Sequence, residues 1–149
     1  MADVLSKTDR LLLDALMENA RVPLTTLASK LRIPRSTLKE HLRRLEREKV
    51  IRGYTVVRNH EALNESMTAF VMVQIGANPA QSLTEYAKRI GRLPLVEEVH
   101  VITGEWDIMV KIRGADMKSI YKTAQALDPE TGYGRTLTIL AFETTKEPV

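Results

Sequence analysis

Residues 24–47 read LTTLASKLRIPRSTLKEHLRRLER, and this stretch decides the fold of the first half of the chain. Pro23 suits the first turn of a helix whose apolar residues recur at helical spacing up to Leu31. Ile33 precedes a proline and therefore avoids the helical conformation, which ends the helix early. A longer helix begins near Pro34 and extends to about Lys49. A short helix, a tight turn and a longer helix form a helix-turn-helix pattern.

The residues before and after this pattern complete a small N-terminal domain. Ser6 and Asp9 have the spacing of a capping box, with Asp in place of the usual Glu or Gln. Apolar residues then recur at helical spacing to about Asn19, which predicts a first helix. After the third helix, Arg52–Arg58 has β character and predicts a small wing or a connecting strand. The polar stretch 59–66 is expected to be a linker.

The third helix has the polarity of a DNA-recognition helix, with leucines on one face and mostly basic residues on the other. An inserted helix presents its first turns to base edges, while basic residues further along contact phosphates. Base reading is therefore expected from Ser36, Thr37, Lys39 and Glu40, and phosphate contacts from Arg35, Arg43, Arg44 and Arg47. The alternative is a solvated surface helix stabilised by Glu40–Arg44 and Arg43–Glu46 pairs. His41, at the edge of the leucine stripe, is interpreted as a packed boundary residue.

Composition is that of an ordinary folded protein, with 44% apolar and 28% charged residues among 149. Residues 1–60 carry 13 Lys and Arg against 7 Asp and Glu, whereas residues 61–149 carry 9 against 12. A basic half joined to a mildly acidic half favours a polyanion partner for the first half. The chain has no cysteine, so thiolate metal sites and disulfides are excluded. With neither a signal peptide nor an apolar membrane span apparent, we expect a cytoplasmic protein.

The second half alternates strand and helix patterns in the order βαββαβ. The expected strands are 67–76, 96–103, 107–113 and 135–143, and the expected helices begin at Asn78-Pro79 and at Met117. This order is typical of the ferredoxin-like fold, four antiparallel strands with two helices on one face. The whole chain is therefore α+β, with a helix-turn-helix (winged-helix-like) domain at 1–51, a connecting strand and linker at 52–66, and a ferredoxin-like domain at 67–149.

Two strands of this second domain are apolar on both faces. In the first strand Val71 and Val73 lie on one face and Met72 on the other, and the last strand alternates in the same way through Leu140 and Phe142. Two helices can cover only one face of a sheet, so the other face needs a second cover. A second copy of the chain is the simplest one, and we expect a sheet-to-sheet homodimer in which Phe142 and Met72 meet the partner. A long loop or the N-terminal domain is the alternative cover.

The chain resembles the Lrp/AsnC, or feast/famine, family of transcription regulators along essentially its whole length. The residues that carry the resemblance in the first half are Asp9, Leu12, Leu13, Leu16, Glu18–Arg21, Leu27-Ala28, Ser36–Leu38, Arg43–Glu48, Val50-Ile51 and Gly53-Tyr54. In the second half they are Val99, Thr103–Asp107 and Met109-Val110. The resemblance implies a homodimer that often assembles into octamers, binds double-stranded DNA at semi-palindromic operators, and responds to amino acids held at subunit contacts.

Three positions depart from the family pattern. Arg32 and Pro34 stand in the helix-turn-helix turn where the family usually has glycine and serine, and Lys49 stands where a glycine usually follows the third helix. A left-handed backbone there would cost Lys49 about 1 kcal/mol that glycine avoids. Arg32 also adds positive charge beside Arg35 at the end expected to face DNA.

The loop Thr103-Gly104-Glu105-Trp106-Asp107 is the expected effector site. An amino acid needs acceptors for its ammonium, which Glu105 or Asp107 could supply, and donors for its carboxylate, which the amides around Gly104 could supply. Thr136 and Thr138 of the last strand are expected on the subunit-contact face, where they would add hydroxyls to this pocket. The alternative is a simple hairpin whose Trp106 caps the core. Neither a metal site nor a cofactor is expected.

Two other functions compete with a sequence-specific regulator. Haem-pathway decarboxylases resemble these regulators in both domains, and His100 would then be a candidate pocket residue. A weakly specific architectural DNA-binding protein is the other alternative. The strongly basic third helix favours DNA over the enzyme, since a decarboxylase has no need of it, and no catalytic triad, P-loop or GxGxxG is visible. The sequence therefore predicts a DNA-binding regulator and not an enzyme.

Overall fold

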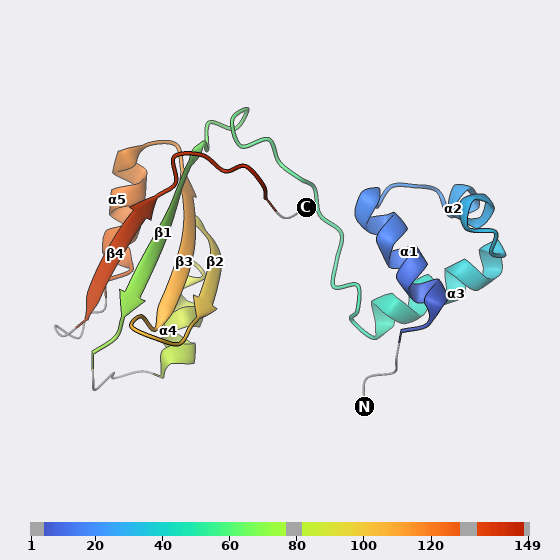
Figure 1. Cartoon of the computed structure of the whole chain (residues 1–149), viewed down its shortest axis with the longest axis horizontal. Helices are drawn as coiled ribbons and strands as arrows, with labels where there is room; N and C mark the ends of the chain where they lie inside the picture. Colours follow the sequence, from blue (N-terminus) through green and yellow to red (C-terminus); the bar gives the residue numbers. More distant parts are fainter. Residues whose placement is uncertain (1–4, 77–81, 129–133, 148–149) are drawn as a thin grey trace. The chain divides into compact units, whose positions relative to one another are not determined.

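The computed structural model describes residues 5–76, 82–128 and 134–147, which form two compact units that divide between Val57 and Arg58. The described part of the first unit contains three helices, and that of the second a four-stranded sheet with two helices (Figure 1). No helix in these described ranges is long and apolar enough to cross a lipid bilayer.

The first unit consists of α1 (Lys7–Glu18), α2 (Leu24–Leu31) and α3 (Arg35–Arg47). The predicted capping box is confirmed: the Ser6 hydroxyl accepts from the Asp9 amide, and the Asp9 carboxylate accepts from the Ser6 amide at 2.8 Å. The core of the unit is made by one apolar stripe from each helix, and its fully buried leucines are Leu12, Leu27, Leu38 and Leu45. The helix-turn-helix predicted from residues 24–47 is therefore present.

Two of the positions that depart from the family pattern have a left-handed backbone. Arg32, directly after α2, has φ 55°, and Lys49, two residues after α3, has φ 59°. A side chain with a Cβ is strained in this region by about 1 kcal/mol relative to glycine. Both turns thus hold a left-handed residue that is not glycine, at a cost in stability.

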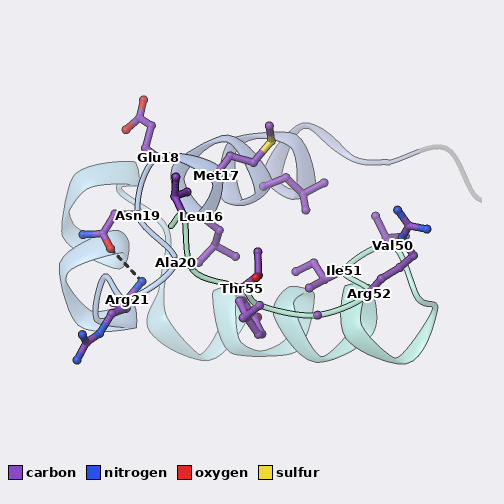
Figure 2. A pocket seen from close by; sticks show the side chains of 14 residues that line it. Leu16, Met17, Glu18, Asn19, Ala20, Arg21, Val50, Ile51, Arg52 and Thr55 are labelled. Carbon is purple, nitrogen blue, oxygen red and sulfur yellow. Dashed lines mark hydrogen bonds between the residues drawn. The ribbon is translucent and has the colours of Figure 1, made fainter. Parts of the chain in front are cut away.

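The expected strand at Arg52–Arg58 is wrong, because the segment forms no ladder with any described strand. It continues past α3 as irregular chain, tied by the Tyr54 hydroxyl, which donates to the Glu46 carboxylate at 2.8 Å. Between this segment and the end of α1 lies a mainly apolar cleft of about 600 Å³ (Figure 2). The following stretch 59–66, expected to be a linker, contains consecutive turns that backbone hydrogen bonds close at Asn64 and Glu65.

A buried carboxylate joins α1 to α3. Asp9 is fully buried, and its carboxylate accepts hydrogen bonds from the Ser6 hydroxyl at 2.6 Å and from His41 Nδ1 at 2.7 Å, and pairs with the Arg44 guanidinium. Burial alone would raise the pKa of Asp9, but the hydrogen bonds from Arg44, Ser6 and His41 outweigh it and hold the pKa well below its usual range. Asp9 therefore stays ionised and fixes the angle between α1 and α3.

The second unit is the predicted ferredoxin-like βαββαβ arrangement. Its elements are β1 (Met67–Gln74), α4 (Leu83–Ile90), β2 (Val96–Val101), β3 (Ile108–Gly114), α5 (Met117–Ala126) and β4 (Arg135–Leu140). The antiparallel sheet has the order β2-β3-β1-β4. Helix α4 begins later than expected because the Ser82 hydroxyl caps it, and Asn78-Pro79 lies outside the described residues. Strand β4 is shorter than expected and ends before Phe142.

The core of this unit lies between the sheet and the two helices. Ala69, Val71 and Val73 of β1 are fully buried there, together with Ile120 of α5 and Ile90 of α4. Gly114 ends β3 close to α5. A Cβ at this position would lie 2.7 Å from the Ser119 hydroxyl, which leaves no room for a side chain. The helices therefore cover one face of the sheet and leave the opposite face open.

We predict that Asp9→Asn lowers the free energy of unfolding of the first unit by about 2–3 kcal/mol, because it leaves Arg44 without its buried partner. Urea unfolding followed by circular dichroism measures this loss. Because the folded pKa of Asp9 is lowered, its contribution is complete above the unfolded carboxyl pKa of about 3.9 and is lost as the pH falls below it. The difference between wild type and variant should therefore shrink in acid.

Asp14→Asn is the matched control, since Asp14 is an exposed carboxylate on the same helix. It should change stability by no more than about 0.5 kcal/mol. Equal stabilities of the Asp9→Asn and Asp14→Asn proteins at neutral pH would contradict the assigned role of Asp9.

Candidate DNA interface and effector site

The exposed side of α3 carries a single stripe of polar residues. At 3.6 residues per turn, the side chains opposite Leu38 and Leu45 are Ser36, Glu40, Arg43 and Arg47. All four are exposed, as are the flanking Arg35 and Lys39, whereas Thr37 is half-buried. The helix therefore presents four of its predicted base-reading and phosphate-contacting residues to solvent on one surface, which we call the α3 stripe (Ser36, Glu40, Arg43, Arg47).

Arg44 is placed differently from expectation. Its guanidinium points back to Asp9 and only 30% of its side chain is exposed, so it supports the helix from the inner side. The alternative pair Glu40–Arg44 is correspondingly not formed. His41, which is 23% exposed and bonded to the same carboxylate, occupies the boundary position predicted for it. The positive surface of α3 therefore comes from Arg35, Lys39, Arg43 and Arg47, with Arg32 exposed in the turn.

The loop 103–107 closes one end of the sheet in the second unit. Asp107 is half-buried, and its carboxylate accepts a hydrogen bond from the Ile75 amide at 2.7 Å. Gly104 has φ +120°, a conformation that residues with a side chain rarely adopt, which explains glycine at the turn. Asp107 thus holds the loop to the end of β1, so that of the two carboxylates Glu105 is the more exposed one.

Arg135 is a functional candidate that the sequence reasoning missed. Its guanidinium pairs with the Glu105 carboxylate, donates to the Gln74 side chain at 2.8 Å and lies 4.7 Å from the centroid of the Trp106 ring. The Gln74 amide in turn donates to the Glu105 carbonyl at 2.8 Å. A cation, a carboxylate and an aromatic face therefore meet at this loop. The sequence held one signal for Arg135. It precedes Thr136 in the same strand, so the two side chains point to opposite faces of the sheet.

The expected placement of Thr136 and Thr138 is wrong. The register pairs Val73 with Thr136 and Val71 with Thr138, and directly paired residues point to the same face of a sheet. Both threonines therefore lie on the side of the sheet that the helices cover, although at its exposed edge. Phe142, expected on the subunit-contact face, lies beyond β4 and is fully exposed. A shift of one residue in the pairing of β4 with β1 moves every side chain of β4 to the other face of the sheet. The faces of β4 are therefore the reverse of those expected.

The open face of the sheet has an apolar half on β1 and β4. Phe70 and Met72 of β1 pair with Ile139 and Leu137 of β4, which are 49% and 45% exposed. Arg135 pairs with Gln74 on the same face, so the loop cluster lies at one end of this apolar surface. The expected second apolar face exists, but it is confined to this half.

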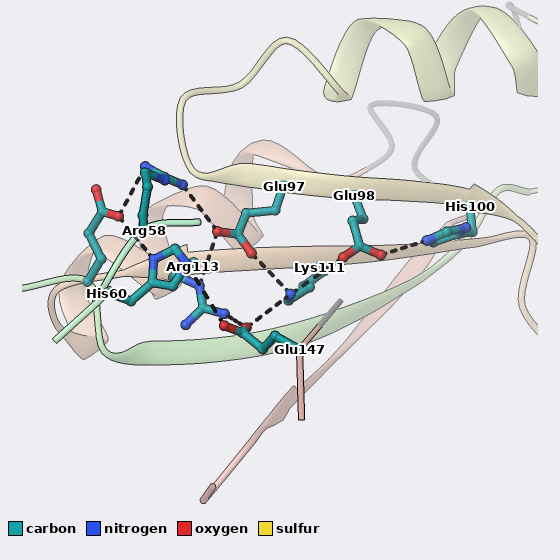
Figure 3. Close-up of polar contacts among 9 residues, drawn as sticks. Arg58, His60, Glu97, Glu98, His100, Lys111, Arg113 and Glu147 are labelled. Carbon is teal, nitrogen blue, oxygen red and sulfur yellow. Dashed lines mark hydrogen bonds and ion pairs between the residues drawn. The ribbon is translucent and has the colours of Figure 1, made fainter. Parts of the chain in front are cut away.

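The other half of the open face, on β2 and β3, is a network of ion pairs (Figure 3). Lys111 Nζ lies 3.2 Å from Glu97 and 3.4 Å from both Glu98 and Glu147, and Arg113 pairs with Glu97 at 3.1 Å. Burial alone would lower the pKa of Lys111, but the carboxylates of Glu97 and Glu147 raise it above its ordinary value. Since the chain's own charges already occupy this half, it has no need of an apolar cover.

The turn region 58–65 also joins this network. Arg58 lies 3.4 Å from Glu65 and 3.6 Å from Glu97, and His60 lies 3.9 Å from Glu147. His100, the candidate pocket residue of an enzyme, is bonded to Glu98 at 3.1 Å on the exposed surface of β2. The described structure thus places His100 beside Glu98, at the edge of this surface network.

Comparison with known proteins adds family evidence to this geometry. Residues 68–149 match the family model for the Lrp/AsnC ligand binding domain, and residues 5–52 match that for winged helix-turn-helix DNA-binding. The chain is 37% identical to an HTH-type transcriptional regulator of Pyrococcus furiosus over 100% of both chains. It is 26% identical to the leucine-responsive regulatory protein of Escherichia coli (strain K12), covering 96% of this chain and 88% of that protein.

A solved structure agrees over the whole chain. The feast or famine regulatory protein from Mycobacterium tuberculosis, complexed with L-methionine, is similar with a TM-score of 0.86 and 26% identity, over 97% of this chain and 96% of that one. Both domains of the resemblance are therefore matched, in the same order along the chain. The chain belongs to the Lrp/AsnC family and is a helix-turn-helix transcription regulator with a C-terminal ligand-binding domain.

Proposed function

We propose that the protein binds double-stranded DNA through the α3 stripe and that a homodimer built on the sheet positions two such helices on an operator. The observation that carries the proposal is the exposed basic surface of α3, whose inner side is fixed by Asp9. Its partner DNA would place the protein in the cytoplasm of a bacterial or archaeal cell. The proposed activity requires neither catalysis nor a cofactor.

Arg43→Ala and Arg47→Ala should weaken binding to all DNA sequences alike, because arginines facing the backbone contribute affinity without base information. Log affinity falls linearly with log salt concentration, and each variant should reduce the magnitude of that slope by about 1. Fluorescence anisotropy with a random-sequence duplex at several salt concentrations measures the slope. Lys88→Ala, which removes a basic residue of α4 in the other unit, is the control and should leave the slope unchanged. Unchanged slopes in both arginine variants would remove α3 from the interface.

The dimer proposal rests on the apolar half of the open face. Leu137 and Ile139 are each about half exposed beside Phe70 and Met72, and an apolar surface of this kind is typical of a subunit contact. A second copy of the same sheet offers the same residues in return, as two-fold symmetry requires. Assembly of such dimers into larger rings such as octamers is the further expectation from the family.

Ile139→Asp should dissociate the dimer, since a charge buried in an apolar contact without a partner is costly. Thr138→Asp introduces the same charge on the neighbouring residue of the opposite face and should leave the dimer intact. Sedimentation of both proteins at micromolar concentration gives the answer. A monomeric wild type, or dissociation by both variants alike, would count against this surface.

The effector proposal concerns the cluster of Arg135, Glu105 and Trp106. An amino acid bound there would replace the internal ion pair, giving its carboxylate to Arg135 and its ammonium to Glu105, with its side chain against Trp106. The L-methionine complex of the similar mycobacterial protein supports an amino acid as the class of effector. Since the cluster adjoins the apolar half of the open face, a bound effector would favour one assembly by its differential affinity.

Calorimetric titration with the twenty amino acids tests the pocket. We expect at least one amino acid to bind wild type, and Glu105→Gln to weaken it about tenfold through loss of a charge-assisted hydrogen bond. Glu61→Gln, an exposed carboxylate in the turn region, is the control and should bind as wild type does. Asp107 is left intact because it holds the loop. If no amino acid binds, or Glu105→Gln binds equally well, the loop has only a structural role.

A further inference from the structure

Glu40 lies in the middle of the α3 stripe, among residues that are otherwise neutral or basic. The carboxylate is exposed, one turn after Ser36 and one turn before Arg43. No residue in the described part of the chain forms a hydrogen bond or an ion pair with it, and the guanidinium of Arg44 is held by Asp9. Among the described residues, Glu40 therefore does not take part in holding the fold together.

A carboxylate at this position opposes binding to any DNA. The phosphate backbone is a dense line of negative charge, and affinity for it comes from the cationic side chains of the helix. Glu40 faces the same surface as Arg43 and Arg47, so it reduces the attraction that they provide. A helix that only had to adhere to DNA would be better served by a neutral side chain here. A contact that only some sequences can make would offset this loss of affinity.

The chemistry of the major groove restricts that contact. A carboxylate is an acceptor only, and the donors on base edges there are the amino groups of cytosine N4 and adenine N6. Adenine presents its N7 acceptor next to its amino group, which suits an amide better than a carboxylate. Guanine and thymine present acceptors at the corresponding edge and repel it. Cytosine is therefore the base that fits Glu40.

We propose that Glu40 determines specificity in the operator by accepting a hydrogen bond from the amino group of a cytosine and by rejecting guanine and thymine at that position. The proposal rests on the proposed function, in which α3 enters the major groove. Glu40 acts directly and not through Arg43, because the two side chains form no ion pair in the described structure. One cytosine per half-site is thus expected at a fixed position.

The test is selection of bound duplexes from a random-sequence library by the full-length protein. Wild type should enrich a motif containing an invariant cytosine in each half-site. Glu40→Gln should replace that cytosine by adenine, since an amide pairs with adenine N6 and N7. Glu40→Ala should lose the preference at that position only, with discrimination reduced about tenfold, or about 1.4 kcal/mol. Both variants should bind random duplex more tightly than wild type, because a repulsive charge is gone.

Glu18→Gln removes the same charge from α1, away from the stripe, and should leave the motif unchanged. Arg43→Ala should keep the cytosine while weakening every sequence. If the wild-type protein enriches no motif, the proposed function itself is overturned. If wild type enriches a motif and both Glu40 variants enrich the same motif at every position, only the role of Glu40 is overturned. Thermal unfolding of each variant by circular dichroism verifies that the selections compare folded proteins.

Discussion

The carboxylate of Asp9 is removed from water and still carries its charge. Burial of an ion is costly, and here the cost is offset by donors from Ser6, His41 and Arg44 that satisfy both oxygens. Two of these donors belong to α3, so the ion fixes the rotation of that helix about its own axis. A rotation by one residue would bring Arg44 outward and the α3 stripe inward. The surface offered to DNA therefore depends on an interaction on the opposite side of the helix.

The sheet of the second unit is divided by the same kind of electrostatic constraint. On the β2–β3 half the cations Lys111 and Arg113 of β3 are almost buried, and they are kept there by carboxylates from two separate segments, β2 and the end of the chain at Glu147. On β1 and β4 the open face has no charges between Arg135 and Thr68, and its apolar side chains remain partly exposed. One half of the face is thus complete within the chain, while the other half is the surface proposed for the dimer.

Much of this arrangement could be predicted from the sequence, because local rules decide it. The three helices, the capping box and the order βαββαβ follow from periodicity and from turn residues such as Pro34 and Gly114. The faces of β4 could not be predicted, because they depend on the register with β1, which the strand pattern alone does not contain. The inward turn of Arg44 was missed for a similar reason: its partner Asp9 is 35 residues away in sequence.

The register of β4 also decides what an effector could change. Because Arg135 pairs with Gln74, its side chain lies on the same face as Leu137 and Ile139, further along one strand. The guanidinium that closes the loop 103–107 is thus continuous with the surface proposed for the dimer. An amino acid that displaced Glu105 from Arg135 would alter charge and side-chain position at the end of that surface, with no rearrangement of the core needed. A ligand shifts an equilibrium between two assembly states by its differential affinity for them. Coupling between effector binding and assembly therefore requires only that the contacts of Arg135 differ between those two states.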